Sequence, residues 1–118
     1  MLEGCRIVVV EDDPIVSLDL DFTLSEAGAI VVGPFADTAT ALAGEGLADA
    51  AVLDVNLGAG SVFPLAERLD RAGVPILFHT GYWDVTWLRR MFPHAEILPK
   101  PSLPEEIVTS LGELLCRR

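Results

Sequence analysis

The residues best suited to chemistry in this sequence each follow a short apolar run. They are the carboxylates of Glu11, Asp12 and Asp54, the hydroxyl of Thr80 and the ammonium of Lys100. Carboxylates that lie close together repel one another, and a hard divalent cation such as Mg²⁺ relieves the repulsion. A carboxylate nucleophile beside Mg²⁺, with a hydroxyl and a lysine to hold phosphoryl oxygens, can accept a phosphoryl group in line. Asp54 is the candidate nucleophile.

Each of these residues taken alone also has a structural explanation. An acidic cluster can begin a helix near its positive dipole end, a threonine can cap a helix, and a lysine is usually a surface charge. The functional interpretation requires three carboxylates, a hydroxyl and an ammonium to meet at one place in the fold. The elements that carry them therefore decide between the two interpretations.

Short β-branched runs predict five strands, at residues 6–10, 30–32, 51–53, 75–78 and 96–98. Such continuous apolar strands are typical of a sheet buried on both faces. Stretches with helical spacing lie between them, which predicts crossover βαβ units and an α/β fold with a parallel sheet. A (βα)5 count favours the doubly wound, flavodoxin-like strand order 2-1-3-4-5, in which functional residues gather at the carboxyl ends of the strands.

Helical spacing predicts which side chains face the core. These inner positions are Val16, Leu20, Leu24 and Ala27 in the first helix, Val62, Leu65, Ala66 and Leu69 in the third, Val85, Leu88 and Met91 in the fourth, and Ile107, Val108, Leu111, Leu114 and Leu115 in the last. Asp37 and Ser61 are the predicted N-caps of the second and third helices. Ser102 and Glu105 stand in capping-box relation, with Pro104 in the first turn of the last helix.

The first predicted helix carries a second apolar stripe. At about 100° per residue, Ile15, Leu18 and Phe22 lie nearly opposite the inner positions, with polar residues along both flanks. One stripe has to face outward, and an exposed apolar stripe beside a phosphoacceptor is typical of a partner site. We expect these three residues to dock the phosphodonor, unless neighbouring loops or a homodimer cover them.

The composition excludes several classes of partner. The 118 residues carry 8 basic and 18 acidic side chains, a net charge of −10, which disfavours nucleic acid and anionic membranes. A hydrophobic fraction of 51% suits a single domain over residues 1–118 with a filled core. No spanning segment or signal peptide is recognisable, and Cys5 and Cys116 have no metal-site spacing. We therefore expect a cytoplasmic protein with free thiols.

Four motifs in order resemble those of the receiver domain of two-component response regulators. They are residues 8–14 (VVVEDDP), 53–57 (LDVNL), 78–81 (FHTG) and 98–101 (LPKP). Any one of them is weak evidence, but each stands at a predicted strand end and together they cover essentially the whole chain. The resemblance implies a CheY-like fold and a phosphoacceptor that catalyses only its own phosphotransfer and dephosphorylation. Its partners would be a histidine kinase or histidine phosphotransfer protein and an unidentified downstream protein.

The resemblance also implies a role for individual residues. Asp54 would be phosphorylated, Asp12 would bind Mg²⁺ directly, Glu11 would act through metal-bound water, and the backbone carbonyl of Asn56 would be a further metal ligand. Thr80 would bond a phosphoryl oxygen. Lys100 would pair with the phosphoryl group, next to a Lys100–Pro101 bond that the family usually holds in cis. If the motif were shifted by one residue along the run of three acidic residues, Asp13 would belong to the acidic pair. In the family, however, the pair follows the strand directly.

The sequence departs from the family near its expected switch. The family commonly has an aromatic residue three places before the lysine, and this sequence has Ile97 there. Because Tyr82 and Trp83 follow Thr80 closely, we expect Thr80, Tyr82 and Trp83 to form the switch; alternatively, the two aromatic side chains cover the core. Residues 78–82 (FHTGY) are similar to a subfamily named for a Phe-Ala-Thr-Gly-x-Tyr string, often stand-alone receivers, with His79 replacing the alanine.

Two other functions compete with the phosphoacceptor. A receiver-fold binding module that works without phosphorylation is disfavoured because Asp12, Asp54, Thr80 and Lys100 are all present. A phosphatase of the haloacid dehalogenase type would need a second aspartate two places after the nucleophile, where this chain has Asn56.

Overall fold

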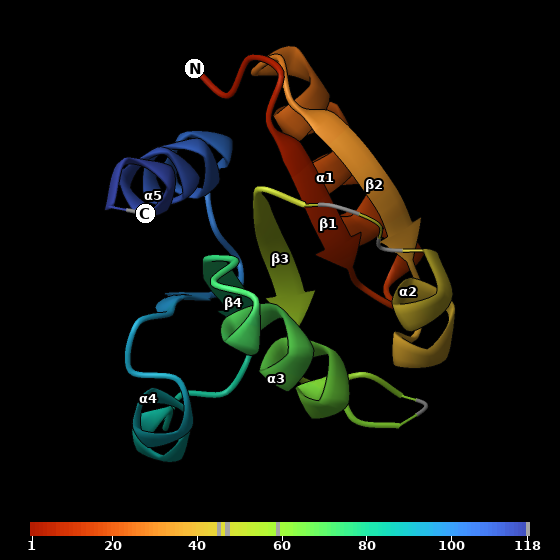
Figure 1. Cartoon of the computed structure of the whole chain (residues 1–118). Helices are drawn as coiled ribbons and strands as arrows, with labels where there is room; N and C mark the ends of the chain where they lie inside the picture. Colours follow the sequence, from red (N-terminus) through yellow and green to blue (C-terminus); the bar gives the residue numbers. More distant parts are fainter. Residues whose placement is uncertain (45, 47, 59, 118) are drawn as a thin grey trace.

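A single parallel sheet forms the centre of the molecule. The computed structural model describes residues 1–44, 46, 48–58 and 60–117. The strands are β1 (Arg6–Val10), β2 (Ile30–Phe35), β3 (Ala50–Asp54), β4 (Ile76–Thr80) and β5 (Glu96–Pro99). Their order in the sheet is β2-β1-β3-β4-β5, and every neighbouring pair is parallel (Figure 1). The predicted α/β fold and strand order are therefore confirmed.

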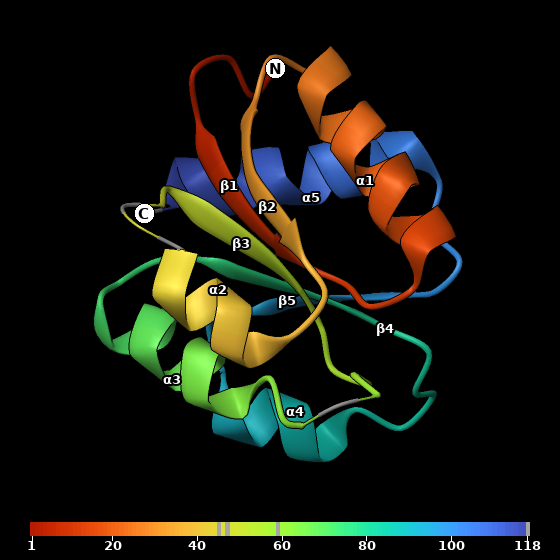
Figure 2. The ribbon, with the colours of Figure 1, turned by 90° about the vertical axis from the view of Figure 1, so that its right-hand side faces the viewer.

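In the described part of the chain, five helices cover the two faces of this sheet. They are α1 (Pro14–Glu26), α2 (Thr38–Gly44), α3 (Phe63–Arg71), α4 (Thr86–Met91) and α5 (Pro104–Arg117). Figure 2 shows α1 and α5 on one face and α2, α3 and α4 on the other. Within the described residues, no helix is both long and apolar enough to cross a membrane.

Two separate apolar layers fill the space between helices and sheet. In β1, Ile7 and Val9 pack in the layer under α1 and α5, whereas Val8 and Val10 pack in the layer under α2, α3 and α4. Successive side chains of a strand point to opposite faces, so a strand covered on both sides must be apolar throughout. This requirement explains why the central strands read as continuous runs of valine, alanine, leucine and isoleucine.

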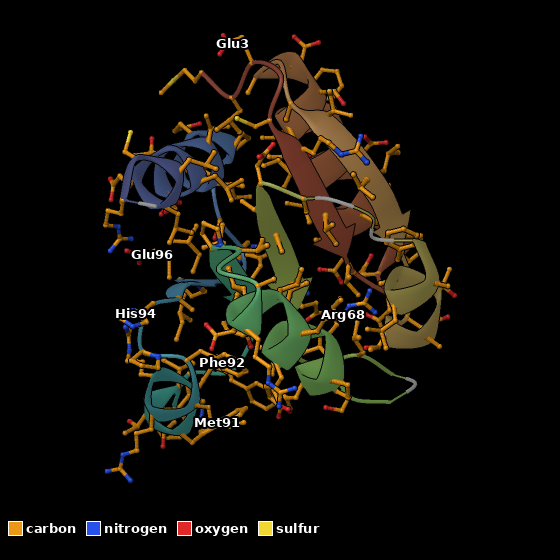
Figure 3. The ribbon with its side chains drawn as sticks, in the orientation of Figure 1. Glu3, Arg68, Met91, Phe92, His94 and Glu96 are labelled. Carbon is orange, nitrogen blue, oxygen red and sulfur yellow. The ribbon has the colours of Figure 1, made fainter. Side chains whose placement is uncertain are left out.

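The inner face of α4 differs from the prediction at its last turn. Leu88 is buried as predicted, but Met91 is 47% exposed and Phe92 is 3% exposed (Figure 3). Phe92 leaves helical geometry, with φ −132° and ψ 75°. Its ring therefore turns into the core, with centroids 6.2 Å from Phe63 and 5.2 Å from Phe78. The prediction for Met91 was wrong because helical spacing was extended to the residue where the helix ends.

The helix starts agree with the prediction only in part. Asp37 caps α2, since its Oδ1 accepts a hydrogen bond from the Thr40 N–H at 2.8 Å. Ser61 lies one residue further out than predicted, because α3 begins at Phe63, although the Ser61 Oγ still accepts from the Phe63 N–H at 3.1 Å.

The predicted capping box of α5 is wrong. The Ser102 hydroxyl donates to the Pro99 carbonyl oxygen at 2.6 Å, and the Leu103 N–H donates to Glu106 Oε1 at 2.8 Å. α5 begins at Pro104, one residue later than a cap at Ser102 implies. Because Glu105 and Glu106 are adjacent, the sequence allows either one to accept the capping hydrogen bond. The turn that follows β5 places Glu106, and not Glu105, within reach of the free N–H.

An irregularity in β2 requires glycine and bears on the polar edge of the sheet. The pairing register of β1 with β2 shifts between Val8 and Val10. Gly33, beside this shift, has φ +105°, and a Cβ atom there would lie 2.7 Å from the backbone nitrogen of Phe35. Only glycine tolerates this conformation and this contact. The shift leaves the Phe35 carbonyl oxygen 2.9 Å from the backbone N–H of Glu11, which donates to it.

Two glycine substitutions should therefore change stability in opposite directions. We expect Gly33→Ala to lower the free energy of unfolding by about 1–3 kcal/mol, because its backbone becomes strained. Gly112→Ala should raise it by about 0.5–1 kcal/mol, since Gly112 lies within α5 and a Cβ there meets nothing within 4 Å. Urea denaturation followed by circular dichroism measures both. A Gly33→Ala protein as stable as wild type would contradict the strain.

Candidate functional site

The carboxyl ends of four neighbouring strands bring the predicted polar residues together. Asp54 is the last residue of β3 and pairs in register with His79 of β4. Thr80 is the last residue of β4 and pairs with Pro99 of β5. Lys100 follows directly, and its backbone N–H donates to the Thr80 carbonyl oxygen at 2.8 Å. The sheet topology thus places residues far apart in the sequence at one edge.

Three carboxylates form the acidic part of this edge. Glu11, Asp12 and Asp54 each offer an oxygen that lies within 4.8 Å of the other two. Glu11 and Asp54 are each 2% exposed, whereas Asp12 lies at the surface. Backbone N–H groups hold all three: Asp13 donates to Glu11 Oε2 at 3.1 Å, Gly58 to Asp12 Oδ2 at 2.7 Å, and Asn56 to Asp54 Oδ1 at 3.0 Å.

Lys100 joins two of these carboxylates. Its Nζ lies 2.8 Å from Glu11 Oε1 and 3.2 Å from Asp54 Oδ2. The Lys100–Pro101 peptide bond is cis. With all groups ionised, three carboxylates and one ammonium leave two negative charges uncompensated. Two of the three carboxylates are buried, so this residual charge is costly, and a cation at this edge would relieve it.

The ionisation of Asp54 reflects this crowding. Burial, together with the nearby Glu11 carboxylate, raises the pKa of Asp54 to about 6, against the opposing effects of the Asn56 N–H and the Lys100 ammonium. Burial alone would lower the pKa of Lys100, but the carboxylates of Glu11 and Asp54 outweigh it and raise the pKa. Lys100 therefore stays charged at neutral pH, and Asp54 is mostly ionised there.

The donor set fits Mg²⁺. All three cluster members offer carboxylate oxygens, which are hard ligands, and the exposed Asp12 leaves one side open to water. The cluster contains no thiol or imidazole that would favour a softer metal. The Asn56 carbonyl stays a predicted ligand.

Asp13 has a different role from the two acidic residues before it. Its Oδ1 accepts hydrogen bonds from the backbone N–H groups of Ile15 at 2.9 Å and Val16 at 3.3 Å. Asp13 is therefore the N-cap of α1. Glu11 and Asp12, which follow β1 directly, are the members of the run that reach the carboxylate cluster.

The residues predicted to form the switch follow β4. Thr80 is fully buried, and its Oγ1 accepts a hydrogen bond from the Tyr82 N–H at 3.1 Å. Trp83 is 95% exposed, which excludes the alternative that it covers the core. Tyr82 is also exposed, but its ring meets that of Trp87 edge to face at 6.2 Å. Ile97 is half-buried against the core on β5.

His79 was not predicted as part of the site, but the structure places it beside Asp54. It is 4% exposed, and neither ring nitrogen has a hydrogen-bond partner in the described part of the chain. Burial, together with the Lys100 charge, lowers its pKa, although Asp54 acts in the opposite direction. The ring is therefore neutral and adds no positive charge to this edge. In the sequence, the feature that could have pointed to His79 is a histidine near the end of an otherwise apolar strand.

The second apolar stripe of α1 faces outward. Ile15, Leu18 and Phe22 are 80%, 71% and 65% exposed, whereas Leu20 and Leu24 on the inner side are buried. The stripe begins two residues after Asp13, so it lies next to the acidic residues. The outward orientation agrees with the helical spacing, and the docking role stays a prediction.

Comparisons with solved structures identify the fold family. No protein-family model matches the chain, and no curated protein matches it. SdrG from Sphingomonas melonis Fr1 is 34% identical, with a TM-score of 0.79 over 95% of this chain and 97% of that one. A response regulator receiver protein from Sinorhizobium medicae WSM419 is 28% identical, with a TM-score of 0.80 over 98% of both chains. The non-phosphorylated HemR receiver domain from Leptospira biflexa is 28% identical, with a TM-score of 0.82 over 95% of this chain and 94% of that one.

These likenesses extend over nearly the whole chain, and the polar edge lies where the four motifs predicted it. The chain therefore has the fold of response regulator receiver domains, to which these structures are similar.

Proposed function

We propose that this protein accepts a phosphoryl group on Asp54 from a phosphohistidine donor, in a Mg²⁺-dependent reaction, and changes its surface for a downstream protein. One observation carries the proposal: Asp54 lies within 4.8 Å of the Glu11 and Asp12 oxygens and 3.2 Å from the Lys100 ammonium. Grouping these carboxylates lowers the stability of the fold unless a cation and a phosphoryl group bind there. The donor is a histidine kinase or a histidine phosphotransfer protein.

The chemical step uses groups of this edge and the donor, with Mg²⁺ bound at the carboxylates. A carboxylate oxygen of Asp54 attacks the phosphorus, the new O–P bond forms, and the P–N bond to the donor imidazole breaks with its electron pair left on nitrogen. Lys100 can turn from Glu11 towards a phosphoryl oxygen, and the Thr80 hydroxyl can donate to another. Asp12, Asp54, the Asn56 carbonyl and, through water, Glu11 would hold Mg²⁺. When bound, Mg²⁺ neutralises charge on the phosphoryl oxygens.

We further propose that Thr80 passes the change to Tyr82 and Trp83. The Thr80 Oγ1 now accepts from the Tyr82 N–H. When the Thr80 hydroxyl turns towards a phosphoryl oxygen, this N–H loses its acceptor and the segment has to find another arrangement. No aromatic switch residue is needed at Ile97. We also propose that the chain is similar to the Phe-Ala-Thr-Gly-x-Tyr subfamily, with His79 in place of the alanine.

We also propose that Ile15, Leu18 and Phe22 dock the phosphodonor. They form an exposed apolar stripe on the helix that Asp13 caps beside the acidic cluster. A donor histidine must reach Asp54, so a surface that starts at this edge can hold the donor in place. Occupation of the stripe by a second copy, as a homodimer, is the competing possibility. A cytoplasmic location agrees with this role.

A binding module that works without phosphorylation is the second candidate function. The exposed stripe on α1 would serve such a module equally well. It would not require three carboxylates and a lysine at one edge, which cost stability when unliganded. Phosphorylation of Asp54 therefore decides between the two functions.

Substitution of single acidic residues should separate the nucleophile from its neighbours. Asp54→Asn should abolish acid-labile phosphorylation by acetyl phosphate, because the amide is no nucleophile. Asp12→Asn should weaken Mg²⁺ binding first and phosphorylation as a consequence. Asp13→Asn is the matched control and should be phosphorylated like wild type, since asparagine caps a helix about as well as aspartate. Phos-tag gels measure all three, and wild-type labelling of the Asp54 variant would show that the nucleophile is another residue.

Mg²⁺ binding should weaken in acid. The pKa of Asp54 is raised to about 6, so a proton competes with the metal below that pH. From pH 7 to pH 5 we expect the Mg²⁺ affinity of wild type to fall by about tenfold. In Asp54→Asn, affinity should be weaker but much less dependent on pH over this range. Isothermal titration calorimetry provides the measurement, and equal pH dependence in both proteins would remove Asp54 from the metal site.

The docking proposal predicts a donor-specific defect. Leu18→Asp should slow phosphotransfer from the protein donor by about tenfold or more, because it places a charge in an apolar contact. Phosphorylation by acetyl phosphate should hardly change. Met91→Asp is the control, since Met91 is also exposed but lies on α4, across the sheet (Figure 2). Equal loss with both donors would mean that Leu18 supports the fold and does not dock the donor.

A further inference from the structure

Asp12 differs from the other two carboxylates of the acidic cluster in how it is held. Glu11 and Asp54 are each 2% exposed, and each accepts a hydrogen bond from the backbone N–H two residues further along the chain. The Asp12 side chain is exposed, and its Oδ2 accepts from the backbone N–H of Gly58, 46 residues away, at 2.7 Å. The exposed carboxylate is therefore oriented by a segment from another part of the chain.

The sheet brings this segment to Asp12. β1 and β3 are neighbours, with Val10 in register with Leu53, so the segments that follow the two strands leave the sheet side by side. Leu57 is 8% exposed and packs in the apolar layer under α2, α3 and α4. The chain is thus anchored one residue before Gly58, which gives the N–H of Gly58 a defined position beside the carboxylate.

The glycine at this position serves a close contact and not an unusual backbone conformation. The φ of Gly58 is not positive, in contrast to that of Gly60, which is +91°. A Cβ atom at Gly58 would lie 3.2 Å from Asp12 Oδ2, which is closer than ordinary van der Waals contact. A side chain here would press on the carboxylate, whereas glycine lets the N–H approach it freely.

A hydrogen bond of this kind supports a metal ligand. An ionised carboxylate has about four lone-pair sites on two oxygens, so one N–H at Oδ2 leaves room for a cation. Carboxylates that bind metals are commonly hydrogen-bonded in turn to neighbouring groups, which fix their orientation. Asp12 lies within the carboxylate cluster while this bond is in place. The bond therefore reduces the side-chain freedom that Asp12 would lose on binding a cation.

From these observations we propose that the Gly58 N–H is a positioning group for Mg²⁺ binding and acts through Asp12. It presets the Asp12 carboxylate towards the other two members of the cluster. The inference rests on the metal role of Asp12 in the proposed function, and it adds a residue that lies outside the four motifs. It also makes the segment between β3 and α3 part of the metal site through a group that is not itself a ligand.

Two substitutions at Gly58 test the proposal. Both proline and alanine add a Cβ atom, but only proline lacks the N–H. Gly58→Pro should weaken Mg²⁺ binding by about tenfold or more. Gly58→Ala should stay within about threefold of wild type, because the hydrogen bond can lengthen from 2.7 Å and remain normal. Isothermal titration calorimetry with magnesium chloride measures both. Equal affinities of the two variants, or tighter binding by Gly58→Pro, would overturn the proposal.

The same pair in an Asp12→Ala background separates positioning from a general disturbance of the segment. Without the carboxylate the N–H has nothing to hold, so Gly58→Pro should then cause no further loss of Mg²⁺ affinity. A loss of the same size in both backgrounds would assign the effect to the backbone and refute the positioning role. Wild-type Mg²⁺ binding by Asp12→Ala alone would remove Asp12 from the metal site, which would defeat that part of the proposed function and this inference together.

Amide hydrogen exchange tests the bond without any change at Gly58, and so also covers a Gly58→Pro variant that fails to fold. Gly58 is exposed, and its amide proton is protected only while it is bonded. We expect exchange in wild type to be about tenfold slower than in Asp12→Ala, both without Mg²⁺ and with it. NMR spectra of the full chain give these rates. Protection that disappears when Mg²⁺ is added would show that the metal competes with the N–H for Asp12, and would overturn the proposal.

Discussion

The Lys100 ammonium is the interaction on which the polar edge depends. It lies 2.8 Å from Glu11 and 3.2 Å from Asp54, two carboxylates that are almost completely buried. Without this cation the apolar layers of the sheet would enclose carboxylates with no positive partner. One lysine cannot compensate three carboxylates, so the edge folds with residual negative charge. The same interaction that stabilises the fold thus leaves negative charge at this edge that a divalent cation would neutralise.

The surfaces of the molecule are arranged around this edge. α1 begins at the cap formed by Asp13, and its outward stripe continues away from the acidic residues. The segment after Thr80 leads in the other direction, through Tyr82, to the rings that surround Trp87. Both surfaces therefore begin at strand ends. The parallel topology accounts for this, because it directs every carboxyl-terminal loop to the same side of the sheet.

Much of the fold was predictable because burial on both faces demands continuous apolar strands, and their alternation with helices restricts the topology. The residues of the polar edge were predictable because each follows such a strand. Local geometry was harder: the inward turn of Phe92 and the choice of Glu106 over Glu105 depend on where a helix ends or begins, which spacing alone does not define. His79 was noted only as a replacement for alanine, because its position beside Asp54 depends on the pairing of β3 with β4, which the sequence does not show.

The separation of the two outward surfaces by the sheet has a kinetic consequence. α1 packs on one apolar layer and α4 on the other, so the stripe around Leu18 and the rings around Trp87 lie on opposite sides of the molecule (Figure 2). A protein bound at one of them leaves the other free. With the phosphodonor on α1, as proposed, the face of the sheet that carries α4 would stay open, so a target bound there would not require release of the donor.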